Sequence, residues 1–212
     1  MSKEENVIRY YVLCNKLKNL IRTGWKDWNV KSNRLESVAE HIYGVQMLAI
    51  AMASEYNYDI NLSRVIMMLA VHELEEIFIG DLTLFEISSE EKEKIGHEAI
   101  EKVLSSLANK DEIKSLIIEF DGRKTNESRF AYYCDKLECD IQSKIYDEKD
   151  CVDLNHQSNN KSFNDSEVQK LLNSGMSWSD MWLTFSQNRY NYDENFMSVS
   201  NYVKKHNIAK NI

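Results

Sequence analysis

Val65-Ile-Met-Met-Leu-Ala-Val71 runs directly into His72-Glu-Leu-Glu-Glu76, and this junction decides the fold. The seven apolar residues leave no polar face, a pattern typical of a helix that other helices enclose. The absence of proline and the presence of only six glycines in 212 residues favour long helices over a sandwich of short strands. The sequence therefore predicts an all-α protein whose central helix, over about 62–78, turns abruptly from apolar to acidic.

A second predicted helix opens at a capping box formed by Ser37 and Glu40, in which each side chain satisfies a free amide of the first turn. Its apolar spacing continues to about residue 56, and it carries His41 in its first turn. Another helix, over about 126–146, carries Asp135 at its middle. Three predicted helices thus bring polar side chains to otherwise apolar faces.

The domain organisation follows from a change in composition near residue 150. Residues 151–164 are rich in asparagine and serine and predict a loop or linker. We expect one core domain over 1–150 and a C-terminal helical extension over 165–212 that packs on the core or on a dimer partner.

The formal net charge of −8 argues against binding to a nucleic-acid polymer, which needs a basic surface. The charge is uneven, however: residues 6–35 carry seven basic side chains and one acid, whereas residues 72–101 carry ten acids and two lysines. Two ordinary solvated faces would explain this pattern. Alternatively, a cationic opening segment holds a small anion beside an acidic metal site.

The amino-terminal MSKEEN lacks the features of a signal peptide, and the longest apolar run is too short to cross a membrane. We therefore expect a cytoplasmic protein without membrane contact. The four cysteines form no metal-binding or disulfide pattern and are expected to be reduced.

The acidic end of the central helix calls for a cation. Glu76 lies four residues after His72 and three after Glu73, so the three side chains can share one helix face. Closely spaced carboxylates at an apolar helix end repel one another unless a cation is present, and a divalent metal would supply it. Taken singly, His41 could be a hydrogen-bonded core residue and Asp135 could pair with a neighbouring base, so both readings stay open.

Other metal sites fail on spacing. The zinc-protease pattern H-E-x-x-H needs histidine where Glu76 stands, and the Glu-x-x-His motifs of di-iron bundles are absent from the sequence. Glycine-rich phosphate loops and structural zinc patterns are absent too.

The remaining pattern resembles the HD-domain phosphohydrolases, and within them the 5'-deoxynucleotidases. Three stretches carry the resemblance: Arg22-Thr-Gly-Trp25, Glu36-Ser-Val-Ala-Glu-His41, and His72-Glu-Leu-Glu-Glu76 with Ile79-Gly-Asp81. It covers about residues 10–148. The resemblance implies a bundle of about six helices, frequent homodimers, and hydrolysis of deoxyribonucleoside 5'-monophosphates to deoxynucleoside and phosphate.

The resemblance also implies residue roles. One divalent ion (Mn, Co, Mg, Zn, Fe or Ni) would be bound by four ligands: His41, His72, Glu73 and Asp135. Glu76 and Asp81 would be catalytic, the first handling a proton or positioning water and the second supporting the site. Arg22 and Trp25 would meet the phosphate or the sugar of the nucleotide.

One departure from the family pattern concerns Glu73, because the family's second dyad is His-Asp. Glutamate remains a competent oxygen ligand, although its carboxylate lies one methylene further from the backbone. Two alternatives therefore stay open: an HD-type hydrolase of a triphosphate, a cyclic nucleotide or an alarmone, and a metal- or nucleotide-binding regulator with weakened catalysis.

Overall fold

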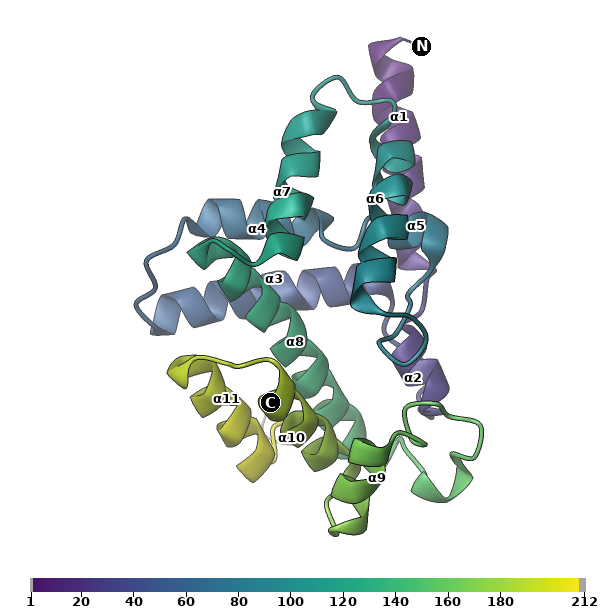
Figure 1. Cartoon of the computed structure of the whole chain (residues 1–212), viewed down its shortest axis with the longest axis vertical. Helices are drawn as coiled ribbons and strands as arrows, with labels where there is room; N and C mark the ends of the chain where they lie inside the picture. The colour runs from purple at the N-terminus through teal and green to yellow at the C-terminus, as the bar shows by residue number, and fades with distance from the viewer. Residues whose placement is uncertain (1, 210–212) are drawn as a thin grey trace. The chain divides into compact units, whose positions relative to one another are not determined.

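The computed structural model describes residues 2–209, and within them it contains helices and no β-strand (Figure 1). The predicted all-α class is confirmed. The chain divides into two compact units, each made of two segments. The first unit comprises residues 1–23 and 36–132, and the second comprises residues 24–35 and 133–212.

The first unit contains most of the predicted site. Its helices are α1 (Lys3–Cys14), the 3-10 turn η1 (Asn15–Lys18), α3 (Val38–Glu55), α4 (Leu62–Val71), α5 (Glu76–Ile79), α6 (Ser89–Leu104) and α7 (Lys110–Gly122). Helix α4 packs on α3 and α7, and α6 packs on α1, α5 and α7. Their apolar faces meet in one core that includes Val38, Val71, Leu74, Ile100, Val103 and Leu116.

Helix α3 begins at the capping box that the sequence predicts. The Ser37 hydroxyl accepts a hydrogen bond from the backbone N–H of Glu40, and the Glu40 carboxylate accepts one from the backbone N–H of Ser37. These bonds satisfy two amides that the first turn leaves without a helical partner. They also fix the position of His41, which lies in that first turn.

The predicted continuous helix over 62–78 is wrong. Helix α4 ends at Val71, His72 is its C-cap, residues 72–75 form a turn, and α5 then runs for one turn from Glu76 to Ile79. The His72 Nδ1 atom lies 2.7 Å from the carbonyl oxygen of Leu69, so the imidazole satisfies one of the carbonyls released at the helix end.

The second unit contains α2 (Thr23–Asp27) from its second residue onward, the 3-10 turn η2 (Leu154–His156), α9 (Ser166–Asn173), α10 (Trp178–Arg189) and α11 (Glu194–Lys205). Helix α10 packs on α9 and α11. Residues 151–164 are folded into this unit, because the Gln157 amide is buried and donates a hydrogen bond of 2.9 Å to the Trp28 carbonyl. The boundaries expected at 150 and 165 stay a prediction.

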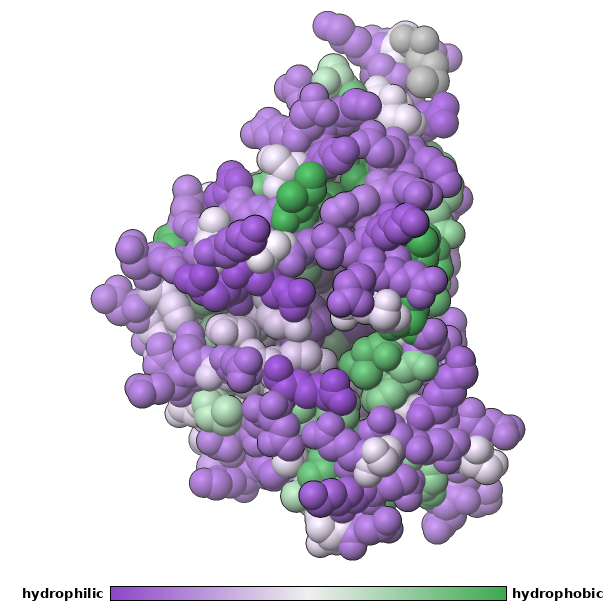
Figure 2. Space-filling view, viewed as in Figure 1, coloured by the Kyte–Doolittle hydropathy of each residue, from purple (hydrophilic) through white to green (hydrophobic). Residues whose placement is uncertain are grey.

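Helix α8 (Asn126–Asp147) begins in the first unit and continues into the second without a break. None of the described helices is both long enough and apolar enough to cross a membrane. Figure 2 shows a mainly hydrophilic surface in which hydrophobic groups form separate patches.

We expect Ser37→Ala to lower the free energy of unfolding by about 1–2 kcal/mol, because it removes the N-cap of α3, a helix that contributes buried residues to the core. Ser2→Ala is the matched control, since Ser2 forms the same capping box at α1, none of whose residues is buried. Fraying of an exposed helix contributes little to global unfolding, so this variant should cost less than half as much. Urea unfolding measures both, and equal losses would contradict the expectation.

Candidate metal centre

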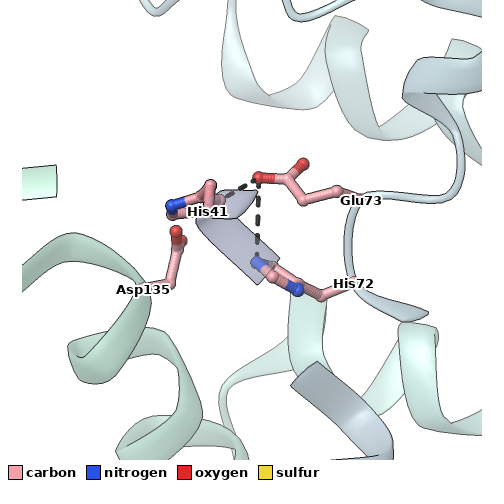
Figure 3. A group of neighbouring side chains, drawn as sticks. All are labelled: His41, His72, Glu73 and Asp135. Atoms are coloured by element: carbon pink, nitrogen blue, oxygen red, sulfur yellow. Dashed lines mark ion pairs between the residues drawn. The ribbon is translucent and has the colours of Figure 1, made fainter. Parts of the chain in front are cut away.

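Two imidazoles and one carboxylate meet in the core of the first unit. His41 comes from the first turn of α3, His72 from the end of α4, and Glu73 from the turn that follows. The Glu73 Oε1 atom lies 3.8 Å from His41 Nε2 and 3.7 Å from His72 Nε2. Dashed lines mark these two ion pairs in Figure 3. The structure therefore brings together three of the four predicted ligands from separate parts of the unit.

The hydrogen bond of His72 fixes which ring nitrogen can bind a metal. Because the Leu69 carbonyl can only accept, Nδ1 must carry the proton, and the lone pair of the neutral ring is on Nε2. The hydrogen bond from Nδ1 to the Leu69 carbonyl also fixes the ring orientation, as is usual for metal-binding histidines. The nitrogen that faces Glu73 is thus the one suited to coordination.

These three groups fit a divalent transition metal. Two imidazole nitrogens and a carboxylate oxygen form a donor set that such ions accept readily. Ligands about 2.1 Å from one ion can lie up to about 4.2 Å from each other, and the observed separations fall within this limit. All three residues are buried, so an ionised Glu73 needs positive charge nearby.

Arg22, which is not a predicted metal ligand, also contacts the Glu73 carboxylate. Its Nη1 atom lies 3.4 Å from Glu73 Oε1 and 3.8 Å from an oxygen of Asp81. The backbone places it there: Ile21 and Ser37 form an isolated antiparallel bridge, and the N–H of Arg22 donates to the carbonyl of Glu36. The segment that carries Arg22 is therefore tied to the start of the helix that carries His41.

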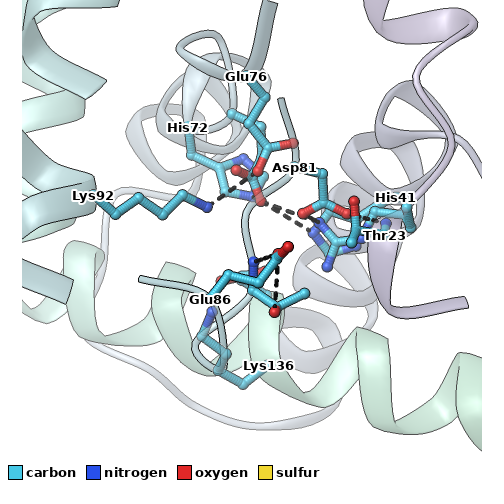
Figure 4. Close-up of polar contacts among 12 residues, drawn as sticks. Thr23, His41, His72, Glu76, Asp81, Glu86, Lys92 and Lys136 are labelled. Carbon is cyan, nitrogen blue, oxygen red and sulfur yellow. Dashed lines mark hydrogen bonds and ion pairs between the residues drawn. The ribbon is translucent and has the colours of Figure 1, made fainter. Parts of the chain in front are cut away.

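Glu76 and Asp81 line the acidic side of this centre (Figure 4). Glu76 is buried, and burial together with the charges of Glu73 and Asp81 raises its pKa well above the usual range. Asp81 follows Gly80, whose φ of 77° ends α5 in a conformation that favours glycine. A carboxylate oxygen of Asp81 accepts a hydrogen bond of 2.5 Å from the backbone N–H of Thr23. Asp81 thus holds the Arg22 segment in place.

The remaining two predicted residues belong to the second unit. Asp135 is buried on α8, and its Oδ2 lies 2.8 Å from Lys136 Nζ. Trp25 is only 2% exposed, and its ring packs against Tyr146, Trp178 and Trp182. The structure gives Trp25 a packing role, and its contact with a substrate stays a prediction.

Sequence reasoning missed Lys92 of α6, whose Nζ lies 3.1 Å from Glu76 Oε1. A signal was present, because Lys92 stands four residues before Gly96 and so extends the buried stripe that includes Gly96, Ala99, Ile100 and Val103. A lysine at an apolar-stripe position needs a buried partner.

Comparison with known families matches residues 14–187 to a family described as HD domain. Among curated proteins, "5'-deoxynucleotidase HDDC2" of Dictyostelium discoideum is 32% identical over 164 residues, which cover 74% of this chain and 83% of that protein. "5'-deoxynucleotidase hdd1" of Schizosaccharomyces pombe is 28% identical, and the match covers 70% of this chain and 76% of that protein. The chain belongs to the HD-domain phosphohydrolase family, in the branch that contains these 5'-deoxynucleotidases.

Solved structures show the same fold. A "predicted metal-dependent phosphohydrolase" from Magnetospirillum magnetotacticum superposes with a TM-score of 0.64 at 20% identity, covering 95% of this chain and 91% of that one. The PH0347 protein of Pyrococcus horikoshii superposes with a TM-score of 0.60 at 22% identity, covering 93% and 98%. The all-α HD-domain bundle is therefore confirmed.

We expect His72→Ala to weaken Mn²⁺ binding at least about tenfold, because it removes a nitrogen ligand from a preformed buried set. His156→Ala is the control, since the His156 side chain is 78% exposed and lies in η2. Isothermal titration of metal-stripped protein with Mn²⁺ measures both affinities. Unchanged binding in His72→Ala would show that the ion, if any, binds elsewhere.

Proposed function

We propose that the protein hydrolyses deoxyribonucleoside 5'-monophosphates to deoxynucleoside and inorganic phosphate, with one bound divalent ion. The observation that carries this proposal is the convergence of two histidines and Glu73 on one point, with Arg22 beside them. A site with metal ligands and an adjacent cation suits a phosphate group. The relatives named 5'-deoxynucleotidases support the substrate class.

Asp135 is proposed as the fourth ligand on its place in the sequence. It follows His41 and His72-Glu73 in the order that resembles the HD-domain family. Its side chain is buried on α8, and a buried carboxylate calls for a nearby positive charge.

A bound divalent ion would polarise the phosphoryl group and make a water molecule more acidic. Arg22 would bind the phosphoryl oxygens and offset the charge that develops on them. Glu76 would orient the attacking water or donate a proton to the leaving 5'-oxygen, and its raised pKa suits a group that carries a proton. The oxygen of water then bonds to phosphorus as the bond to the 5'-oxygen breaks.

We further propose that the protein acts in the cytoplasm on free nucleotides, that residues 1–150 form the catalytic domain, and that Trp25 meets the phosphate or the sugar of the nucleotide. No disulfide joins the four cysteines within the part of the chain that the structure describes, which suits a reducing compartment. The donor set of two imidazoles and a carboxylate accepts several first-row metals.

Purified protein with Mn²⁺ or Co²⁺ should release phosphate from deoxynucleoside monophosphates, and Glu76→Gln should lower kcat by about 100-fold because it removes the group that transfers the proton. Glu98→Gln is the control, because it makes the same change at an exposed position of α6, and its kcat should stay within about twofold of that of the unmodified protein. Phosphate release across a nucleotide panel measures these rates. A folded, metal-loaded protein that is inert on every phosphoester of the panel would refute the proposal, and nucleotide binding without turnover would favour a regulator.

We also propose that the protein is a homodimer that pairs through α1. Four apolar side chains of this helix, Val7, Ile8, Tyr11 and Val12, are 56–60% exposed and form one stripe. Glu4 stands at one end of the stripe and Lys16 follows the other. Antiparallel pairing of two copies would bury both stripes and bring each acidic end to a basic one.

Ile8→Glu should convert a dimer of twice 24.9 kDa to the monomer, because it places a charge in the paired stripe. Ile118→Glu is the matched control, as Ile118 is 47% exposed on α7. Light scattering coupled to size-exclusion chromatography measures the mass. A monomeric unmodified protein, or a dimer that Ile8→Glu leaves intact, would contradict pairing through α1.

A further inference from the structure

Lys92 enters the acidic side of the metal centre from α6. Its Nζ atom lies 3.1 Å from Glu76 Oε1, and the ion pair is drawn in Figure 4. The Glu76 side chain is fully buried, whereas the lysine side chain is 28% exposed. The long aliphatic stem thus delivers a charged group to a carboxylate that water does not reach.

Several carboxylates share this region. Burial lowers the pKa of Lys92, but the negative charges of Glu73, Glu76, Glu75 and Asp81 outweigh burial and raise the pKa overall. Lys92 therefore carries its positive charge at neutral pH. Glu75 lies in the same field, and burial together with Glu73 raises its pKa to about 8.

The two oxygens of Glu76 have different surroundings. Oε1 accepts the hydrogen bond from Lys92, whereas Oε2 is buried and has no hydrogen-bond partner among the described residues. A buried carboxylate oxygen without a partner costs free energy, so its presence in a folded protein calls for a functional explanation. The ammonium group holds one oxygen and leaves the other available.

We propose that Lys92 is a positioning residue for Glu76: it fixes the carboxylate through Oε1 so that Oε2 faces the attacking water or the leaving oxygen of the substrate. This role rests on the proposed phosphohydrolase function and assigns a part to a residue outside the ligand set. Lys92 bonds to Glu76 and is not one of the proposed metal ligands, so it should act on turnover and leave metal binding unchanged.

A purely structural ion pair would behave differently. Loss of such a pair would lower the melting temperature without changing the catalytic constants of the molecules that stay folded. A residue that binds the phosphate would change KM as well as kcat, because the ground-state complex would lose an interaction. A positioning residue changes kcat, since the orientation of Glu76 matters when the proton moves.

The test compares Lys92→Met, Lys92→Arg and Lys94→Met by steady-state kinetics on the preferred deoxynucleoside monophosphate. Lys94 is exposed on the same helix, so Lys94→Met removes the same charge away from Glu76. We expect Lys92→Met to lower kcat at least about tenfold with KM within about threefold. Arginine can still hold the carboxylate and should recover part of the lost kcat. Mn²⁺ affinity should be unchanged in all three variants.

The outcomes separate the two proposals. An unmodified protein that is inert on the whole nucleotide panel refutes the proposed function, and the role of Lys92 falls with it. Three outcomes in an active protein refute only the role of Lys92. In the first, Lys92→Met has the same kcat as Lys94→Met; in the second, Lys92→Met loses activity through KM alone; in the third, Lys92→Arg has no higher kcat than Lys92→Met. If Lys92→Met unfolds at the assay temperature, Lys92→Arg decides the matter. A kcat below that of Lys94→Met with KM unchanged supports positioning, and a kcat equal to that of Lys94→Met contradicts it.

Discussion

The contact of one glutamate carboxylate with two imidazoles is the constraint on which the rest of the structure depends. Glu73 Oε1 lies within 3.8 Å of both His41 and His72, in a part of the core where all three side chains are buried. A buried carboxylate is unstable without positive charge. Arg22 supplies some of this charge at 3.4 Å, and the geometry of the nitrogens leaves room for a metal ion to supply the rest.

The surrounding elements position the side chains that make this contact. The capping box of α3 fixes His41, and the break after α4 directs Glu73 toward the imidazoles. The bridge between Ile21 and Ser37 ties Arg22 to the same point. Two cations, Arg22 beside Glu73 and Asp81 and Lys92 beside Glu76, offset part of the negative charge of the acidic cluster.

Much of this arrangement could be predicted from local sequence rules. Ser37 with Glu40 is a capping signal with a defined mechanism, and the apolar run before His72 has few alternatives to a buried helix. The end of α4 could not be predicted from hydrophobic spacing, because it depends on the bond between the His72 ring and the Leu69 carbonyl. The contact of Lys92 with Glu76 could not be predicted either, since Glu76 lies sixteen residues away on another helix. The environment of Trp25 depends on aromatic residues more than a hundred positions later in the chain.

The central claim is that a divalent ion binds at Glu73 between the two histidines. A crystal structure of protein loaded with Mn²⁺, with the ion located by its anomalous scattering, tests this claim most directly. We predict the strongest anomalous peak about 2.2 Å from Nε2 of His41, Nε2 of His72 and an oxygen of Glu73. A fully loaded crystal whose strongest peak lies away from these three atoms would contradict the account.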